Sequence, residues 1–509
     1  MVNGLTHRIA KNSLFSLGRN VLSIPVLLLI TPYTIGKIGV EEFGLWALVG
    51  ILSSYAQLSD FGITESLTKY IAEHHALGDD AAINRLVNTS FVLYVGFGLL
   101  GAVVLTIGLD FIVSVVLQIP EMLRARVRLV FLASIAIFLF NIVFSVFGTV
   151  IVGFQRLDIT NKILSATLLI GAGTTVLFLE SGYRLEGLVL SNAVTAVIVV
   201  ICQIFFAKKL FPELSLSPRK YFRREAVSRI LSFAWKIQLS NATQILIFQL
   251  DRILLSRFVG LAAVGHYEIA SRIASQVRML VISLFAPMVP AASALHATEE
   301  EDVLTGLYRR SLKYMAATAI PMSVIVISLA HPFIRTWMGE GYDVSSISLQ
   351  LLTAAFMVNL MTGPGAFVLN GINKPHIGMF TSIVGAAVNI TACLLLVGRM
   401  GYFGVIAGIV LALALSALLF FVLLHKHLPG IRLSYYREII VPPLLFSSIP
   451  GVLLLLLEDR YQWAGYPGLF VASAAFATIV VTGLVLFDYF DDFDKNLLKS
   501  LCGFGGGRT

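Results

Sequence analysis

Four stretches of this chain contain no Asp, Glu, Lys or Arg: Leu129 to Gln155, Val344 to Asn373, Met400 to Leu424 and Tyr461 to Phe487. Each is longer than the roughly 20 residues that an α-helix needs to cross the hydrocarbon core of a bilayer. Charged residues make up 13% of the 509 residues, about half of what soluble domains carry. A membrane β-barrel has short alternating segments instead. The sequence therefore predicts an all-α membrane protein with many spans.

Hydropathy and helix length place about fourteen transmembrane helices along the chain. The predicted spans are 13–35, 43–63, 86–109, 127–150, 160–180, 187–207, 228–251, 263–292, 311–333, 346–369, 375–398, 402–424, 438–457 and 464–487. The first of them follows His7, Arg8 and Lys11, as a signal peptide would. It lacks a small-residue cleavage site and continues into further helices, so we interpret it as a span.

The basic residues predict the orientation of these helices. An even number of spans puts both termini on one side, and the segments on that side hold most of the 37 Lys and Arg residues. Cytoplasmic loops are enriched in basic residues. We therefore expect both termini in the cytoplasm and a location in the cytoplasmic (inner) membrane. Basic loops also account for the net charge of +8 without nucleic-acid binding.

Two halves of the chain resemble each other. Two glycines five residues apart, followed by an aromatic residue, occur at Gly39, Gly44 and Trp46 and again 221 residues later at Gly260, Gly265 and Tyr267. In the same order, 152–156 (VGFQR) resembles 370–374 (NGINK), and a Gly-Tyr loop follows each about 30 residues later. Because six spans is an even number, both halves enter the membrane from the same side, and the repeat is parallel.

The repeat predicts two lobes of six helices, which suit alternating access. We expect an N-lobe at 1–207, a cytoplasmic linker at 208–227, a C-lobe at 228–424, and helices 13 and 14 with a cytoplasmic tail at 425–509. The linker holds Pro212 and Pro218, which interrupt regular helix. A surface-bound amphipathic helix and a solvated linker are both compatible with it.

Spans 1, 2, 7 and 8, which are repeat mates, carry polar residues on one face. An Arg or Lys at the bilayer centre costs roughly 2.5–3.5 kcal/mol, so four of them facing lipid would cost on the order of 10 kcal/mol. Arg19 and Lys236 lie near cytoplasmic ends, where snorkelling explains them equally well. Arg272 and Arg278 lie deeper in span 8, which favours a wet cavity for those two.

A cavity with excess positive charge selects an anion, and guanidinium groups hold phosphate oxygens in bidentate geometry. Nearby hydroxyl and amide side chains suit sugar hydroxyls. A polar head on a long lipid cannot cross hydrocarbon unaided. The sequence therefore predicts a phosphate-bearing, glycosylated head group as cargo. The residues predicted to line the cavity are Arg19, Gln57, Lys236, Ser240, Gln244, Arg272, Ser275 and Arg278.

Several segments resemble the polysaccharide-biosynthesis flippases of the multidrug/oligosaccharidyl-lipid/polysaccharide exporter superfamily. The resemblance lies in 41–74 (EEFGLWALVGILSSYAQLSDFGITESLTKYIAEH), 249–273 (QLDRILLSRFVGLAAVGHYEIASRI), 153–163 (GFQRLDITNKI) and 369–375 (LNGINKP). It implies two six-helix lobes around a cationic cavity and flipping of undecaprenyl-pyrophosphate-linked oligosaccharides. As partners it implies membrane lipids and the polysaccharide polymerase and chain-length machinery. Asp251-Arg252 resembles a recurring Asp-Arg pair, whose placement suggests structure or gating.

Two other function classes remain to be weighed. A cation-coupled drug or metabolite exporter of the same superfamily would need acidic residues in its helices, and Asp60, Glu65 and Glu268 are the candidates; Asp60, Asp251 and Glu268 could also serve ion coupling or gating. A membrane enzyme would need a large external loop with catalytic groups, and the predicted outside loops are short. The sequence has no P-loop or metal-ligand spacing, so we expect no enzyme activity, cofactor or metal.

Overall fold

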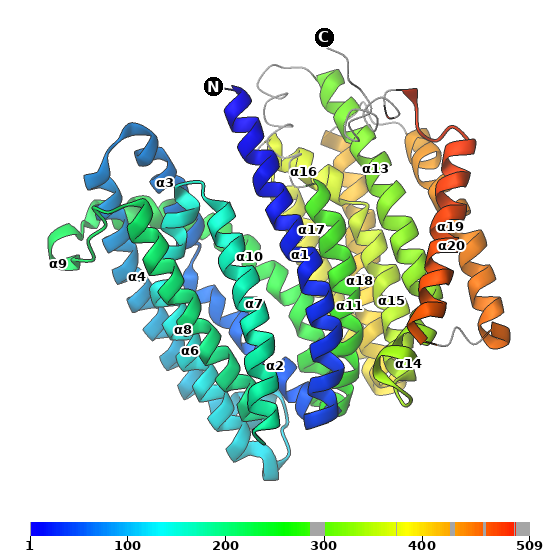
Figure 1. Ribbon diagram of the computed structural model, residues 1–509, viewed down its shortest axis with the longest axis horizontal. Coiled ribbons are helices and arrows are strands. Elements are labelled where there is room, and N and C mark those ends of the chain that lie inside the picture. The colour runs from blue at the N-terminus through cyan, green and yellow to red at the C-terminus, as the bar shows by residue number, and fades with distance from the viewer. Residues whose placement is uncertain are drawn as a thin grey trace. The chain divides into compact units, whose positions relative to one another are not determined.

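A computed structural model describes residues 2–285, 301–372, 374–427, 433–461, 465–492 and 494 of the chain (Figure 1). For residues 2–17, 19–20, 55–57, 233–237 and 239–247, among others, the backbone alone is described. Helices are the only regular secondary structure in these residues. The all-α class predicted from the sequence is confirmed.

The first half of the chain contains thirteen helical elements, up to the end of the eighth predicted span. They are α1 (Val2–Ile38), α2 (Val40–Ala56), the 3₁₀ helix η1 (Gln57–Asp60), α3 (Ile63–Leu77), α4 (Asp80–Ile107), α5 (Leu109–Phe111), the π-helical turn η2 (Ile112–Val116), α6 (Glu121–Gly153), α7 (Leu157–Glu180), α8 (Leu185–Leu210), α9 (Pro218–Tyr221), α10 (Arg224–Phe258) and α11 (Leu261–Phe285).

The second half continues with long helices and two shorter ones. They are α13 (Glu301–Ser328), α14 (Ala330–Met338), α15 (Asp343–Leu360), α16 (Gly363–Gly371), α17 (His376–Met400), α18 (Tyr402–His427), α19 (Leu433–Tyr461) and α20 (Gly465–Leu486). The predicted spans coincide with long helices, with three exceptions: 43–63 covers α2, η1 and the start of α3, 311–333 runs from α13 into α14, and 346–369 covers α15 and the start of α16. Residues 286–292 of the predicted eighth span lie outside the described residues.

Within the described residues, eleven segments are long and apolar enough to cross a membrane. The predicted spans that fail this test are α2, α10 and α11, which correspond to spans 2, 7 and 8. These are three of the four spans in which polar residues were predicted to share a face. They differ from the other spans for separate reasons: α2 has only 17 residues, the side chains of 233–237 and 239–247 in α10 are not described, and α11 carries Glu268, Arg272 and Arg278.

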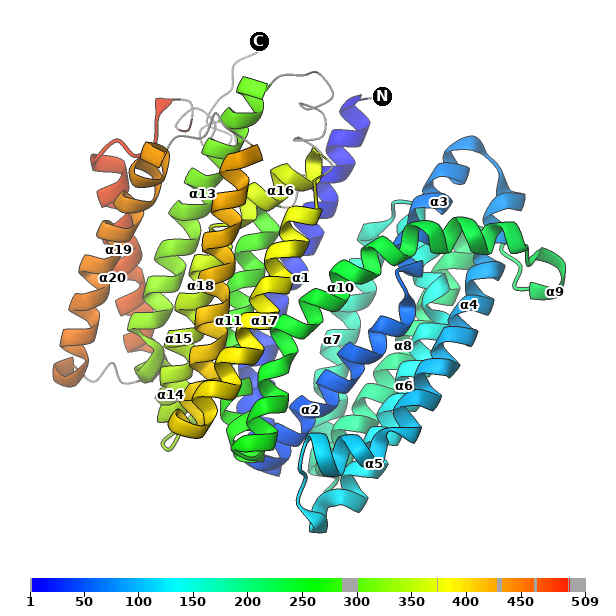
Figure 2. The same ribbon diagram turned by 180° about the vertical axis from the view of Figure 1, so that it is seen from behind.

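The chain divides into two compact units, unit 1 (Met1–Ile269 and Ser382–Ala412) and unit 2 (Ala270–Thr381 and Leu413–Thr509). In unit 1, α4, α6 and α8 run side by side, and α10 passes obliquely from α3 to α2 (Figure 2). Its main apolar core lies between α3, α4 and α6, around Tyr94 and Phe147. In unit 2, α13 packs against α15, α16 and α19, and α19 against α20. Met315 and Leu424 belong to that unit's core.

The predicted repeat is present in the backbone. Gly39 and Gly260 both have positive φ angles, 85° and 121°, and each lies just before the helix that carries the second glycine. Gly44 and Gly265 are then the sites of close backbone approach between α2 and α11. Glycine is required at the first pair for its φ angle and at the second for space.

The second matching motif also forms the same turn in both halves. At the end of α6, the N–H of Phe154 donates to the carbonyl of Val150 (3.0 Å) and that of Arg156 to Ile151 (3.1 Å). At the end of α16, 218 residues on, Ile372 donates to Val368 (3.0 Å) and Lys374 to Leu369 (2.8 Å). The local structure therefore repeats together with the sequence.

The polar connection before α10 is fixed to the membrane helices. The side chain of Asn84 accepts from the N–H of Ser215 (2.9 Å), and that of Asn88 accepts from the N–H of Ser217 (2.6 Å). Both amides also donate to carbonyls of the connection. The sequence left two interpretations open for this connection, a surface-bound amphipathic helix and a solvated linker. These hydrogen bonds show that its backbone is held against α4, and between α8 and α10 the described residues contain one helix, the four-residue α9.

Two helices longer than five residues, α3 and α14, were not predicted. The second span was predicted to end at residue 63 and to be followed by a cytoplasmic loop, but α3 occupies Ile63–Leu77 and buries Leu67 and Ile71 completely. The 3₁₀ helix η1 and the positive φ angles of Phe61 and Gly62 separate it from α2. Similarly, α14 fills part of a predicted outside loop with a short amphipathic helix. Both are too short to stand out in a scan for spans.

Candidate functional site

The polar residues at the junction of α10 and α11 form a buried network in unit 1. Asp251, with 0% of its surface exposed, accepts hydrogen bonds from the Tyr267 hydroxyl (2.9 Å) and the Asn389 amide (3.0 Å). The thiol of Cys393 donates in turn to the Asn389 side-chain oxygen (3.1 Å). Three helices, α10, α11 and α17, are therefore joined through one carboxylate.

An ion pair lies beside this carboxylate. Nε of Arg252 donates to Glu268 (2.8 Å), while Nη1 of Arg252 bonds the Phe248 carbonyl (2.8 Å) and the Gln249 side chain (3.0 Å). The Arg252 guanidinium also lies 5.4 Å from the centre of the Tyr267 ring. The structure thus brings the predicted gating residues Asp251 and Glu268 into one cluster. Both are buried, so they hold α10 and α11 together at this point.

The two deep arginines of the eighth span lie further along α11, in unit 2. Arg272, Ser275 and Arg278 are all half-buried. The guanidinium of Arg278 lies 5.9 Å from the centre of the Phe356 ring on α15. With its charged residues, α11 is not among the helices that are apolar enough to cross a membrane, in agreement with the polarity predicted from its sequence.

Five predicted cavity residues have side chains outside the described part of the chain. Their backbones lie in α1, η1 and α10: Arg19, Gln57, Lys236, Ser240 and Gln244. A described neighbour, Gln238 of α10, donates to the Leu58 carbonyl at the end of the second span (2.7 Å). The predicted roles of the five stay predictions.

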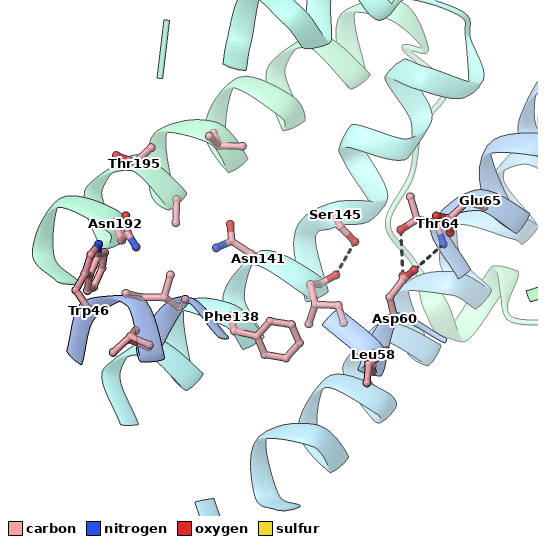
Figure 3. A pocket seen from close by; sticks show the side chains of 17 residues that line it. Trp46, Leu58, Asp60, Thr64, Glu65, Phe138, Asn141, Ser145, Asn192 and Thr195 are labelled. Atoms are coloured by element: carbon pink, nitrogen blue, oxygen red, sulfur yellow. Dashed lines mark hydrogen bonds between the residues drawn. The ribbon is translucent and has the colours of Figure 1, made fainter. Parts of the chain in front are cut away.

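Unit 1 contains a cavity of about 880 Å³, whose described lining comes from α2, η1, α3, α6 and α8 (Figure 3). Asp60 lies at one end, where its carboxylate accepts a hydrogen bond from the Thr64 hydroxyl (3.0 Å). Trp46 and Asn192 lie near the other end. Asn141 projects from α6 between the two ends (Figure 3). Asp60, a predicted ion-coupling residue, therefore shares a cavity with amide and aromatic side chains.

The charge of this cavity differs from the predicted cationic one. The described lining residues include two carboxylates, Asp60 and Glu65, and no Lys or Arg. Sequence reasoning missed Asn141 and Asn192 as site residues, although each is an isolated amide within a long apolar stretch. Among the described residues, no three His, Cys, Asp or Glu side chains converge as metal ligands would.

Two family models match the chain. That of the polysaccharide biosynthesis protein family covers residues 9–296, and that named MatE covers residues 237–395. The first match reaches from α1 to α11 and includes Asp251, Tyr267 and the described lining of the unit 1 cavity, but not Asn389 of α17. The second begins within α10 and ends within α17.

The chain is similar over most of its length to curated membrane proteins. It is 22% identical to the "Uncharacterized membrane protein EpsK" of Bacillus subtilis, over 83% of this chain and 84% of that protein. It is 24% identical to a "Putative O-antigen transporter" of Shigella flexneri, over 69% of this chain and 82% of that protein. These identities are low, but each alignment covers more than two thirds of this chain.

The fold is also similar to that of a solved transporter. The structure titled "Lipid II flippase MurJ, inward closed conformation" superposes with a TM-score of 0.67, at 12% identity, over 95% of this chain and 98% of that one. That coverage includes the helices after the two six-helix repeats, so the likeness extends to nearly the whole fold. The resemblance recognised in the sequence is confirmed: the chain is a multi-pass membrane protein that belongs to the polysaccharide biosynthesis protein family, within the multidrug/oligosaccharidyl-lipid/polysaccharide exporter superfamily.

Proposed function

We propose that this protein flips lipid-pyrophosphate-linked oligosaccharides across the cytoplasmic membrane for surface polysaccharide assembly. Membership of the polysaccharide biosynthesis protein family supports a transport role. Relatives named as an O-antigen transporter and as a probable flippase support this cargo class. The lipid tail would stay in the bilayer while the polar head passes through a wet path between the two predicted lobes, 1–207 and 228–424.

The observation that carries the proposal is the polarity of α11. This helix holds Arg272 and Arg278 at half-buried positions in a chain whose other long helices are mostly apolar. Guanidinium groups bind phosphate oxygens with charge-assisted hydrogen bonds, so these two are the proposed ligands of the pyrophosphate. Arg19 and Lys236 would add positive charge, and Ser240, Gln244, Ser275 and Gln57 would bond the adjoining sugar.

The buried cluster around Asp251 would serve gating. Because Asp251 is enclosed by Tyr267 and Asn389, it cannot touch the cargo in this state, but it fixes how α10 meets α11 and α17. A second closure lies at the predicted outer ends of the helices, where Ser256 of α10 donates to the Leu117 carbonyl (2.7 Å). An outward opening would have to break this contact.

A cellular experiment tests the proposal. In a strain that depends on this protein, Arg272→Ala and Arg278→Ala should each cause lipid-linked oligosaccharide to accumulate on the inner leaflet. A charged hydrogen bond contributes about 1.5–3 kcal/mol, so export should fall by roughly tenfold to a hundredfold. Arg128→Ala is the matched control, because Arg128 is an exposed residue paired with Asp110. Wild-type export by both variants at normal protein levels would remove α11 from the proposed path.

A second candidate function is a cation-coupled exporter of the same superfamily. The specific observation in its favour is that Asp60 and Glu65 line the unit 1 cavity. Such a transporter should move a cationic dye down a proton or sodium gradient, and Asp60→Asn should abolish the movement. Failure of the wild-type protein to transport any cation, with intact oligosaccharide flipping, would exclude this candidate.

Membrane topology is a separate part of the proposal. We place both termini in the cytoplasm because the basic residues favour it. A cytoplasmic reporter fused after residue 430 should be active, and a periplasmic reporter fused there should be inactive. The reverse result would invert every assignment of inner and outer ends.

A further inference from the structure

Faces of three helices line the unit 1 cavity, and those of α6 and α8 carry polar side chains. On α6, Ser134, Phe138, Asn141 and Ser145 are spaced three or four residues apart, as one face of a helix requires. On α8, Asn192, Thr195 and Val199 follow the same spacing, and α2 contributes Trp46 and Gly50. The helices pack pairwise, α6 with α8 and α2 with both. Their faces therefore line one shared space.

The amides of this cavity are available to a ligand. Asn141 and Asn192 are exposed, and within the described part of the chain their side chains make no hydrogen bond. An amide without partners is costly in hydrocarbon. Each can donate two hydrogen bonds and accept two. They are thus suited to hydroxyl or acetamido groups that enter the cavity.

The aromatic and hydroxyl groups extend the same chemistry. Trp46 is half-buried beside Asn192, so one part of its indole reaches the cavity (Figure 3). An indole face packs well against the C–H face of a pyranose ring, while the Thr195 hydroxyl at the same end of the cavity can accept a hydrogen bond from its rim (Figure 3). The cavity volume, about 880 Å³, is within the range of small-molecule sites.

The carboxylates determine which ligands are excluded. Asp60 and Glu65 lie on the same side of the cavity, and no described lining residue is basic. Carboxylates accept strong hydrogen bonds from sugar hydroxyls, but a ligand carboxylate nearby would be repelled. A pyrophosphate close to these two carboxylates would be repelled as well.

We propose that the unit 1 cavity binds the glycan of the cargo and selects uncharged sugars over uronic acids. The proposal rests on the proposed function, since the glycan is part of the cargo proposed there, and it places the sugars at Asn141, Asn192 and Trp46. Selection among sugars would then be a property of α2, α6 and α8.

Four probes test the proposal with the purified full-length protein. They are farnesyl pyrophosphate, the same lipid carrying a disaccharide of two N-acetylglucosamines, the same lipid carrying a disaccharide that ends in glucuronic acid, and free diacetylchitobiose. Wild-type protein should bind the neutral conjugate at least fivefold more tightly than the uronate conjugate. The double variant Asn141→Ala with Asn192→Ala should bind the neutral conjugate about tenfold more weakly, as expected for the loss of two hydrogen bonds. Its affinity for farnesyl pyrophosphate should be unchanged.

Charge removal supplies the opposite test. Asp60→Asn with Glu65→Gln should tighten binding of the uronate conjugate and bring its affinity close to that of the neutral one. Ser181→Ala, at an exposed helix end, is the control for nonspecific change. Equal wild-type affinities for the two conjugates, or a neutral conjugate unaffected by loss of both amides, would overturn the proposal.

The probes separate this proposal from the proposed function. If wild-type protein binds none of the three pyrophosphate probes, the proposed function fails. In that case the cavity proposal stands only if free diacetylchitobiose binds and Asn141→Ala with Asn192→Ala abolishes that binding. A fifth probe, the lipophilic cation tetraphenylphosphonium, tests the cation exporter. If it binds in an Asp60-dependent manner and none of the three glycan-bearing probes binds, the cavity proposal is wrong and the cation exporter is favoured.

Discussion

Gly44 and Gly265 lie against each other's helices in a reciprocal contact. A Cβ atom on Gly44 would lie 2.2 Å from the carbonyl oxygen of Leu261, and one on Gly265 would lie 2.2 Å from that of Val40. Leu261 and Val40 are themselves separated by the repeat distance of 221 residues. The crossing of α2 and α11 is therefore an approximate twofold contact between the two halves of the repeat.

This contact predicts the effect of adding a methyl group. Gly44→Ala or Gly265→Ala should each destabilise the protein by about 1–3 kcal/mol, because backbone and not a flexible side chain must move. The melting temperature of the purified protein in detergent measures the change. Gly173→Ala is the control: its Cβ would meet nothing within 4 Å, so improved helix propensity should leave stability unchanged or higher.

The double variant carries additional information. Once one alanine has separated the helices, the second should cost less, so Gly44→Ala with Gly265→Ala should destabilise by less than the sum of the single changes. Strict additivity, or a single variant as stable as the wild type, would contradict the close crossing.

The Asp251 network predicts that the carboxylate of Asp251 and the amide of Asn389 can exchange places. Asp251→Ala should cost about 1–3 kcal/mol for each buried donor that it leaves without an acceptor, here Tyr267 and Asn389. Asn389→Asp should also destabilise, since it places two carboxylates together without a charge partner. The exchange Asp251→Asn with Asn389→Asp keeps one carboxylate and one amide and should recover much of the loss, measured as melting temperature and yield of folded protein. An exchange as damaging as Asn389→Asp alone would count against the pairing.

The ion pair beside it should respond to loss of either partner. Arg252→Ala leaves buried Glu268 without its 2.8 Å partner and should cost about 3–5 kcal/mol. Arg252→Met with Glu268→Leu, which removes both charges, should be much less harmful. Arg309→Ala is the control for an ordinary surface ion pair. Arg309 and its partner Glu438 are both exposed, so this pair should contribute less than about 1 kcal/mol.

The segment after α20 predicts a pH-dependent contact. Asp494, 2% exposed, accepts hydrogen bonds from Lys313 and Tyr314 of α13. Burial alone would raise the pKa of Asp494, but these bonds outweigh it and hold the pKa below its usual 3.8. A lowered pKa in the folded state stabilises the protein above the unfolded pKa, and this stabilisation is lost as the pH falls through the folded value.

Asp494→Asn should therefore lower the melting temperature at pH 7, and the difference from the wild type should shrink below about pH 4. Thermal unfolding in detergent at several pH values measures it. Asp492→Asn, at an exposed position nearby, should have little effect at any pH. A difference between wild type and Asp494→Asn that grows on acidification would refute the assignment.

The fold was largely predictable because it depends on local pattern. Uncharged stretches such as Leu129 to Gln155 must become buried or lipid-facing helices, and glycines at fixed spacing mark equivalent turns in the two halves. The helix α3 was missed because η1 and the positive φ angle of Gly62 end the second span early, and no hydropathy pattern marks that break.

The sites were predictable only in part. Arg272 and Arg278 stand out because charge is rare in these helices. The partners of Asp251 do not, because Asn389 lies 138 residues away and only the folded chain brings them together. The acidic cavity was missed for the same reason: Trp46, Asn141 and Asn192 come from three helices, and each alone is compatible with ordinary packing.

Flipping by the reconstituted protein is the most direct test of the central claim. In proteoliposomes that hold a fluorescent polyprenyl-pyrophosphate disaccharide in both leaflets, a membrane-impermeant pyrophosphatase outside cleaves only exposed lipid. The account predicts that wild-type protein allows nearly all of the lipid to be cleaved, whereas Arg272→Ala with Arg278→Ala stops at about half, as protein-free vesicles do. Cleavage that stops at half with the folded wild-type protein, or proceeds equally with the double variant, would contradict it.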